Sequence, residues 1–418
     1  MNSHRMTLQT FKPRHANIIS LLDTLKALCH SGRLIASDNG TGKLLPDLTS
    51  HPLDFTTEVS LMFHLMFSLP CLYVIVRFIL PLPWQPSRRI ATAAILVLAS
   101  QYHLYCRFSS GSVFSPEMPR NVIILFNWAF GAIVLLALLQ LMLDSAMVVA
   151  VLIRRRRLSI PMGVRYALAT SALVLAAVGV SQAIRVPPLR DVEIGVRNLP
   201  PEFEGYRVLQ LTDLHISRLF DAPWTQAVVE RANTLDVDLI VVTGDLIDGT
   251  TGARRPDVAP LRDLRAPDGV YVIAGNHEYF FGYEAWMRNF SSLGMTPLTN
   301  SHAVIERQGA KLVLAGVTDF SAPATGFAPP DVGRAIQGAP KDAPIILLDH
   351  QPRKARLAAA QGVSLQLSGH AHGGLIVGLD RLFALANEGF VSGLYDVDGM
   401  ALYVNNGTAL WPGLALRL

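Results

Sequence analysis

The second half of this 418-residue chain predicts an α/β domain, a four-layer sandwich of two mixed β-sheets flanked by helices. An all-α membrane domain of about four transmembrane helices is expected before it. Long apolar stretches crowd the first half, and half of all residues are hydrophobic. In the second half, short runs rich in Val, Ile and Leu alternate with helical patterns, as in strands buried on both faces. Hairpin and crossover patterns mix there, which favours two mixed sheets packed together.

Composition supports a membrane protein and limits its partners. The mean hydropathy of +0.34 is high for a soluble enzyme. The chain has 36 basic and 32 acidic residues, a net charge of +4, and four of the basic residues form one run at 154–157, so nucleic-acid binding is not expected. The three cysteines, Cys29, Cys71 and Cys106, make neither a disulfide framework nor a metal-like pair.

Residues 1–56 are predicted as a poorly ordered leader, and residues 57–184 as the membrane domain. The membrane domain contains four apolar stretches, at 59–82, 90–105, 122–153 and 166–183. A bilayer core needs about 20 apolar residues in a helix. The first and fourth stretches fit this length, the second is short, and the third is long enough to tilt or project beyond the membrane. Each could instead be a buried helix of a soluble core, an alternative that their length disfavours.

Basic residues in short loops predict the orientation. The run at 154–157 and the pair Arg88 and Arg89 place two connecting loops in the cytoplasm. The loop 107–120 and everything after the fourth helix then lie outside, on the extracytoplasmic side of a multi-pass cell (inner) membrane protein. Six basic residues in the leader oppose this orientation, because the leader would also lie outside.

Two ionisable residues, Arg77 and Asp144, fall inside the apolar stretches. They could pair, which would offset part of their burial cost. The sequence favours the other interpretation, in which Arg77 reaches the interface and Asp144 faces other helices alone. No chain of such residues indicates an ion or proton pathway, which counts against a transporter.

Residues 185–190 form the predicted linker, where Pro187 and Pro188 stop the fourth helix. The soluble domain, 191–418, opens with alternating Val192, Ile194 and Val196, which predict its first strand. Further helices are expected at 221–234, 283–293, 331–336 and 353–360, a hairpin at 303–307 and 311–316, and a late strand at 401–404.

Metal-ligand residue types follow five strand-like runs. The run at 208–211 leads to Asp213 and His215, whose side chains point the same way if strand geometry continues. Four more runs end in the same way, with Asp245 and Asp248, with Asn276, His277 and Glu278, with His350, and with His370 and His372. In open α/β sheets the chemistry lies beyond the carboxyl ends of such strands, so we expect these side chains to converge.

These motifs resemble the ordered set of the calcineurin-like metallophosphoesterases. They read Asp213-x-His215, Gly244-Asp245-x-x-Asp248, Gly275-Asn276-His277-Glu278, His350 and Gly369-His370-x-His372. The resemblance covers roughly residues 190–418 and is closest to the bacterial membrane-associated branch with N-terminal transmembrane helices. The last motif of that branch usually reads Gly-His-Thr-His-Gly-Gly-Gln. The departures here, Ala371 and Leu375, concern packing beside the site and not a ligand.

The resemblance implies two divalent metal ions bridged by Asp245. It assigns Asp213, His215 and His372 to the first ion, and Asn276, His350 and His370 to the second. Mixed nitrogen and oxygen ligands fit Mn, Fe or Zn better than Mg or Ca. His277 is the expected catalytic acid, and Asp248 or Glu278 is expected to orient it or a ligand.

The expected function is a membrane-anchored phosphohydrolase that cleaves a phosphoester or a pyrophosphate by metal-activated water. The aromatic run Tyr279-Phe280-Phe281 is either core packing or an apolar wall beside the site. As a wall next to a membrane, it would favour a lipid-linked substrate. The alternative is a non-catalytic membrane sensor or scaffold that binds a phosphorylated ligand through the same domain, and the intact ligand set counts against it.

Overall fold

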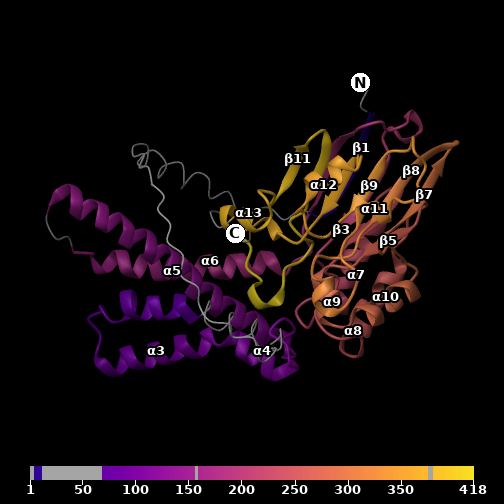
Figure 1. Cartoon of the computed structure of the whole chain (residues 1–418). Helices are drawn as coiled ribbons and strands as arrows, with labels where there is room; N and C mark the ends of the chain where they lie inside the picture. Colours follow the sequence, from indigo (N-terminus) through magenta and orange to yellow (C-terminus); the bar gives the residue numbers. More distant parts are fainter. Residues whose placement is uncertain (1–3, 12–67, 156–158, 375–379) are drawn as a thin grey trace, which may run out of the picture.

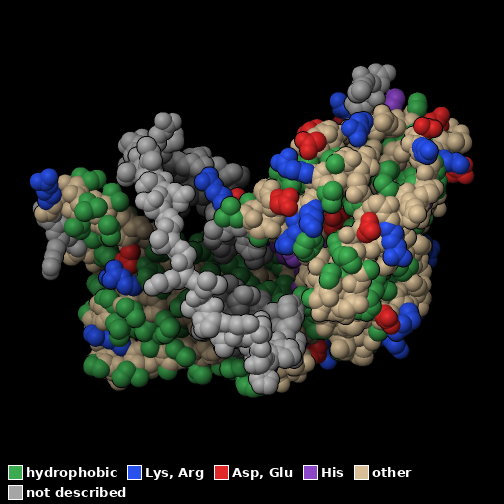
Figure 2. Space-filling view, in the orientation of Figure 1, with side chains coloured by type: hydrophobic (Ala, Val, Ile, Leu, Met, Phe, Trp, Pro, Cys, Tyr) green, Lys and Arg blue, Asp and Glu red, His purple; other side chains and the backbone are tan. Residues whose placement is uncertain are grey.

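The computed structural model describes residues 4–11, 68–155, 159–374 and 380–418. A group of helices from the first half of the chain lies beside an α/β domain with two sheets (Figure 1). Hydrophobic side chains gather on the helical part, whereas charged side chains are spread over the α/β part (Figure 2).

The first sheet has six strands in the order β2-β1-β3-β4-β5-β6. Its strands are β1 (His4–Phe11), β2 (Leu189–Val196), β3 (Arg207–Leu211), β4 (Leu239–Thr243), β5 (Val270–Ile273) and β6 (Thr296–Pro297). β1 and β2 are antiparallel, and the other neighbours are parallel. The predicted first strand is therefore present as β2, although it lies at an edge of the sheet.

The second sheet also has six strands, in the order β11-β12-β10-β9-β8-β7. Its strands are β7 (Ser301–Arg307), β8 (Ala310–Gly316), β9 (Ile345–Leu348), β10 (Leu365–Ser368), β11 (Gly393–Val397) and β12 (Met400–Val404). The hairpins β7–β8 and β11–β12 are antiparallel, and the central neighbours are parallel. Both sheets are therefore mixed, as the sequence predicts.

Alternating side chains of each strand separate the core into layers. On β3, Val208 packs between the two sheets, whereas Leu209 packs under the helices that cover the first sheet. The helices and short 3-10 helices of this domain are α7 (Ala222–Asn233), α8 (Thr251–Val258), α9 (Asn276–Phe280), α10 (Tyr283–Ser292), α11 (Val332–Ala335), α12 (Ala355–Ala360), α13 (Asp380–Ala386), η2 (Pro201–Phe203), η3 (Ala259–Asp263), η4 (Ala322–Thr325), η5 (His372–Gly374) and η6 (Pro412–Leu414). Helices α7 and α10 pack on the first sheet and α12 on the second, which completes the four layers.

The chain's first strand corrects the predicted leader. Residues His4–Phe11 form β1 inside the first sheet, antiparallel to β2 and parallel to β3. Met6 and Leu8 are each 2 % exposed between the sheets. The α/β domain therefore includes residues from the beginning of the chain, and its boundary at residue 191 is wrong, as is the linker's end, because β2 begins at Leu189. The remaining leader, residues 12–56, lies outside the described residues.

Two of the four apolar stretches form long helices. Within the described ranges, α5 (Arg120–Arg154) and α6 (Met162–Ala183) are long and apolar enough to cross a membrane. Only 39 % and 22 % of their most apolar segments are buried, unlike the core helix of a soluble protein. The second stretch is divided at Gln101 into α3 (Pro86–Ser100) and α4 (Tyr102–Ser110). The first is a shorter helix, Ser68–Ile79, that ends in a π-helical turn, η1 (Ile75–Ile79), and residues 59–67 lie outside the described part.

The two ionisable residues in these helices form a pair, contrary to the interpretation that the sequence favoured. Arg77 donates to both carboxylate oxygens of Asp144, from Nε at 2.8 Å and from a terminal nitrogen at 3.1 Å. Tyr73 and Gln140 also donate to this carboxylate. Bidentate pairing with two further donors satisfies the carboxylate, which explains why Asp144 does not remain alone among apolar helices.

Candidate metal centre

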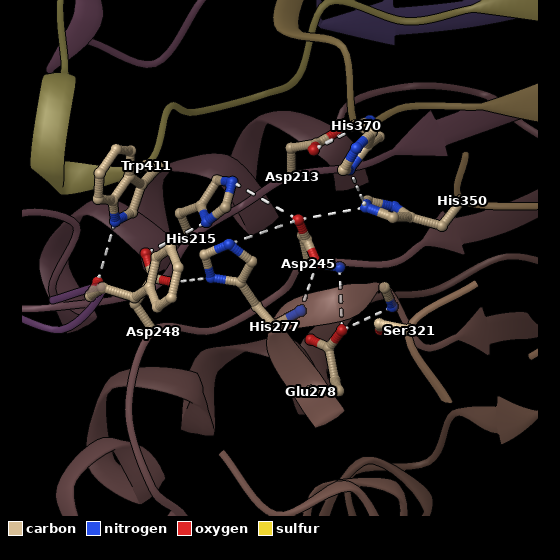
Figure 3. A network of polar contacts seen from close by, with 12 residues as sticks. Asp213, His215, Asp245, Asp248, His277, Glu278, Ser321, His350, His370 and Trp411 are labelled. Carbon is tan, nitrogen blue, oxygen red and sulfur yellow. Dashed lines mark hydrogen bonds and ion pairs between the residues drawn. The ribbon is translucent and has the colours of Figure 1, made fainter. Parts of the chain in front are cut away.

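The ten predicted site residues come from loops at the carboxyl ends of five parallel strands. Three of these strands, β3, β4 and β5, belong to the first sheet, and two, β9 and β10, belong to the second. Because the sheets pack face to face, the five ends open toward the same point. Figure 3 shows Asp245 in the middle, with His215, His277 and His350 pointing toward it.

The site residues reach this point through left-handed backbone, and not by a continued strand. β3 ends at Leu211. Five of the ten residues have positive φ, namely Asp213 (51°), His215 (43°), Asp245 (53°), His370 (66°) and His372 (47°). A non-glycine residue in this region costs about 1–2 kcal/mol. Such strain persists where the surrounding structure over-determines it, and it concentrates at functional sites.

Two glycines allow the loops to approach closely. A Cβ atom on Gly275 would lie 2.3 Å from Oδ1 of Asp245, and one on Gly369 would lie 2.3 Å from Oδ2 of Asp213. Any other residue would displace a carboxylate. These two glycines are therefore required by space.

One group of ligand atoms joins Asp213, His215 and His372. The Nε2 atoms of the two histidines are 3.2 Å apart, and Nε2 of His372 lies 3.5 Å from Oδ1 of Asp213. His215 donates from Nδ1 to Oδ2 of Asp248 at 3.2 Å, so its Nε2 lone pair faces the group. Burial, and next His215, hold the pKa of His372 well below its ordinary value, which keeps its imidazole neutral.

A second group joins Asp245, His350 and His370. Nε2 of His350 lies 3.2 Å from Oδ2 of Asp245 and 3.3 Å from Nδ1 of His370. His350 donates from Nδ1 to the carbonyl of Thr243 at 2.8 Å, so Nε2 is left for ligation. Asp245 also lies 4.0 Å from Nε2 of His215, which places its carboxylate between the two groups.

Two observations fit this cage to a pair of cations. The Nε2 atoms of His215 and His372 face each other across 3.2 Å, a spacing that lets both bind one cation. Oδ1 of Asn276, at the start of α9, is buried without a hydrogen-bond partner. Buried polar atoms are satisfied in most proteins, so an unpaired oxygen on the residue after Gly275, which lies against Asp245 and His350, suits a metal ligand.

His277 lies beside this cage and is held by Asp248. Its Nε2 atom is 3.9 Å from Oδ2 of Asp245, and its Nδ1 atom donates to Oδ1 of Asp248. Burial alone would lower its pKa, but the carboxylates of Asp245 and Asp248 outweigh burial and raise the pKa of His277 to about 9. One buried carboxylate thus orients both His215 and His277.

Glu278 supports the backbone of the cage. Its carboxylate accepts hydrogen bonds from the backbone nitrogens of Gly275 (2.7 Å), Asp245 (3.0 Å) and Leu246 (2.8 Å). It therefore joins the loops that follow β4 and β5. This arrangement gives Glu278 a role in positioning Asp245.

Several residues around the site carry no local signal in the sequence. Phe114, in the connection between α4 and α5, lies edge-on to His277 with ring centroids 5.3 Å apart. Ser115 donates to the carbonyl of Asp248 at 3.0 Å. Arg417 is 2 % exposed and donates to the carbonyls of Asn406, Gly407 and Ala409 in the loop beside Asp213. The contacts of Phe114 and Ser115 join segments more than a hundred residues apart, and no periodicity predicts them.

A cage of carboxylates and imidazoles at the strand ends of two packed mixed sheets defines a metallophosphoesterase domain. Residues 206–374 match the sequence model of the calcineurin-like phosphoesterases. The chain is 30 % identical over 220 residues to the uncharacterized metallophosphoesterase YkuE of Bacillus subtilis, which covers 51 % of this chain and 75 % of that protein. This chain therefore belongs to the calcineurin-like phosphoesterase family.

Animal relatives with a similar name match over a larger part of this chain. Proteins named "Transmembrane protein with metallophosphoesterase domain" are 36 % identical in Danio rerio, over 257 residues, and in Bos taurus, over 258 residues. Each match covers 59 % of this chain, and 58 % and 57 % of the respective relatives. The chain thus spans less than two thirds of these two relatives.

Proposed function

We propose that this protein is a membrane-anchored phosphohydrolase with two divalent ions, Mn, Fe or Zn, that cleaves a phosphoester or a pyrophosphate. The observation that carries this proposal is the convergence of both ligand groups on Asp245, with His277 beside them. The proposed ligands of the first ion are Asp213, His215, Asp245 and His372, and those of the second are Asp245, Asn276, His350 and His370.

The chain's own residues would position the reaction. Two cations in the cage would neutralise the phosphoryl charge and lower the pKa of a bound water. His277, whose pKa is raised to about 9, carries a proton at neutral pH that it can give to the leaving oxygen. Asp248 holds the imidazole by Nδ1, so that Nε2 faces the cage. Glu278 keeps the backbone of Asp245 in place.

Contacts between the helical part and the α/β domain support an anchored enzyme. The connection between α4 and α5 lies on the α/β domain, where Ser115 donates to the carbonyl of Asp248 at 3.0 Å, and Arg120, the first residue of α5, donates to the carbonyl of Leu219 at 3.0 Å. It would therefore share a side of the membrane with that domain, and the basic loops at 88–89 and 154–157 favour the extracytoplasmic side. A cysteine at Leu394, which is 49 % exposed, should react with a membrane-impermeant maleimide on intact cells. Labelling only after lysis would reverse the orientation.

Among possible phosphoester substrates, we favour a lipid-linked one. Phe280 and Phe281 lie against His277, with ring centroids 5.5 and 6.3 Å away, and make one side of the site apolar. An apolar wall beside the proton donor, on a domain held at a membrane, suits an amphiphilic ester.

The test is hydrolysis by the purified full chain. A panel of phosphomonoesters, phosphodiesters and pyrophosphates with added Mn, Fe or Zn should reveal turnover, and His277→Ala and Asp245→Ala should abolish it. His302→Ala is the matched control, because His302 bonds to the carbonyl of Ala335 away from the site. A protein that binds two ions per chain yet cleaves no ester would instead be a sensor or scaffold for a phosphorylated ligand.

A further inference from the structure

A cavity of about 450 Å³ lies between the helical part and the α/β domain. This volume falls within the range of about 300–1,000 Å³ that is typical of small-molecule sites. One wall comes from the connection between α4 and α5, and the other from the loops after β4 and β5. Its lining includes Gly111, Val113 and Phe114 on the first wall, and Gly249, Ala253 and Phe280 on the second.

Two aromatic rings that line this cavity also contact the proposed proton donor, His277. Phe114 stacks on Phe280 with ring centroids 5.1 Å apart and planes 20° from parallel. Both rings also lie against His277, at 5.3 and 5.5 Å. A group that occupies the cavity would therefore extend away from the side of the site where the leaving oxygen departs.

Polar contacts fix the first wall against the α/β domain. Trp411 donates from Nε1 to the carbonyl of Phe114 at 3.2 Å, and Ser115 donates to the carbonyl of Asp248 at 3.0 Å. Glu117 forms ion pairs with Arg218 and with the fully buried Arg254. These bonds hold the Phe114 ring against His277. The cavity is therefore part of the folded structure and is preformed before a ligand binds.

The helices that carry this wall are apolar on their outside. Phe108 on α4 is 77 % exposed, and Leu125 on α5 is 57 % exposed. Both lie close in sequence to the wall, so the cavity lies near the surface that a bilayer would cover. An apolar chain could therefore reach the cavity from the membrane, past Arg107 and Glu117, which also line it.

We infer that this cavity receives the unbranched apolar chain of the leaving alcohol, and that Phe114 and Ala253 determine specificity for that chain. The inference rests on the proposed phosphohydrolase function and names its substrate as an alkyl-chain phosphoester. In the reaction, the bond between phosphorus and the alkoxy oxygen breaks. Water supplies the hydroxyl that forms the new phosphorus–oxygen bond, and its remaining proton leaves with the alcohol.

The test is a chain-length series with the full chain in lipid nanodiscs. Substrates are n-alkyl phosphates from ethyl to octyl, and methyl n-alkyl phosphates in parallel, all below their micellar concentrations. Burial of a methylene contributes about 0.8 kcal/mol, so kcat/KM should rise up to about fourfold per methylene until the cavity is filled. Ala253→Trp should flatten this dependence, because the indole would fill the cavity.

Gly252→Trp is the matched control, because Gly252 is exposed on the same helix and lies outside the cavity lining. It should keep the wild-type dependence on chain length. A flat wild-type series with measurable turnover would overturn this inference and leave the proposed function standing. Absence of turnover for every ester would instead overturn the proposed function. The wild-type series decides between these results even where the tryptophan variant does not fold.

Discussion

Replacing Asp248 with asparagine should separate the two histidines that this residue holds. Asp248 is fully buried, and each of its carboxylate oxygens accepts from a different Nδ1, that of His215 at 3.2 Å and that of His277. Asparagine has one acceptor oxygen, and its amide nitrogen is a donor. The Nδ1–H group of one of the two imidazoles would therefore face the amide N–H group of asparagine, donor against donor. That imidazole would have to carry its proton on Nε2 instead of Nδ1.

Both outcomes impair the site. A proton on Nε2 of His215 removes the lone pair that faces His372 across 3.2 Å, which weakens metal binding. A change at His277 disturbs the proposed proton donor instead. Substitution of a residue that orients a metal ligand typically costs 10–100-fold in affinity or activity, or about 1.4–2.8 kcal/mol. We expect Asp248→Asn to lose this much in Mn affinity, in kcat/KM, or in both.

The pH profile tests the electrostatic part of this reasoning. If His277 is the proton donor, as proposed, its protonated form is the active form. Activity should then fall as pH rises through its pKa of about 9, or through a lower value once cations are bound. Loss of the Asp248 charge lowers this pKa, so the alkaline limb of Asp248→Asn should move to lower pH. Asp257→Asn is the control, because Asp257 pairs with Arg254 and touches neither histidine. The argument would be refuted if Asp248→Asn kept the wild-type metal affinity and its activity fell at the same alkaline pH as that of wild type.

Three further results are expected. Leu8→Ala should lower the free energy of unfolding by about 2–5 kcal/mol in denaturant titrations, because Leu8 is buried. Arg5→Ala is the control on the same strand, and loss of its exposed ion pair should cost less than about 1 kcal/mol. Equal costs would contradict a buried β1. Asp144→Leu should lower the midpoint temperature of thermal unfolding in detergent, because it leaves Arg77 unpaired. The double variant with Arg77→Leu should recover the wild-type midpoint. If Asp144→Leu alone is as stable as wild type, the pair is not stabilising. EDTA should lower the thermal midpoint, and added Mn should restore it, because metal binding relieves the repulsion of clustered ligands; a midpoint that EDTA leaves unchanged would argue against a metal cage.

The proposed ligand residues could be identified in the sequence because each one follows a local signal. Short apolar runs mark strands that are buried on both faces, and Asp, Asn or His directly after them marks the strand ends. Helix α7 was predictable for a similar reason, since Asp221 accepts from the backbone nitrogen of Trp224 and starts an amphipathic helix. The route by which Asp213 and His215 converge was not predictable, because left-handed backbone at both residues depends on the packing of loops from other strands.

The sequence by itself determined the α/β class, the strand ends that carry the proposed ligands, and two long apolar helices, because these depend on periodicities a few residues long. The tertiary structure alone decided that His4–Phe11 belongs to the first sheet, since a strand is defined by hydrogen bonds to partners some two hundred residues away. It also brought Phe114 to His277 and placed Leu416 between Gly131 of α5 and Gly179 of α6. Such contacts form only when whole helices and loops pack together. The local sequence around either residue therefore does not predict its contact partner.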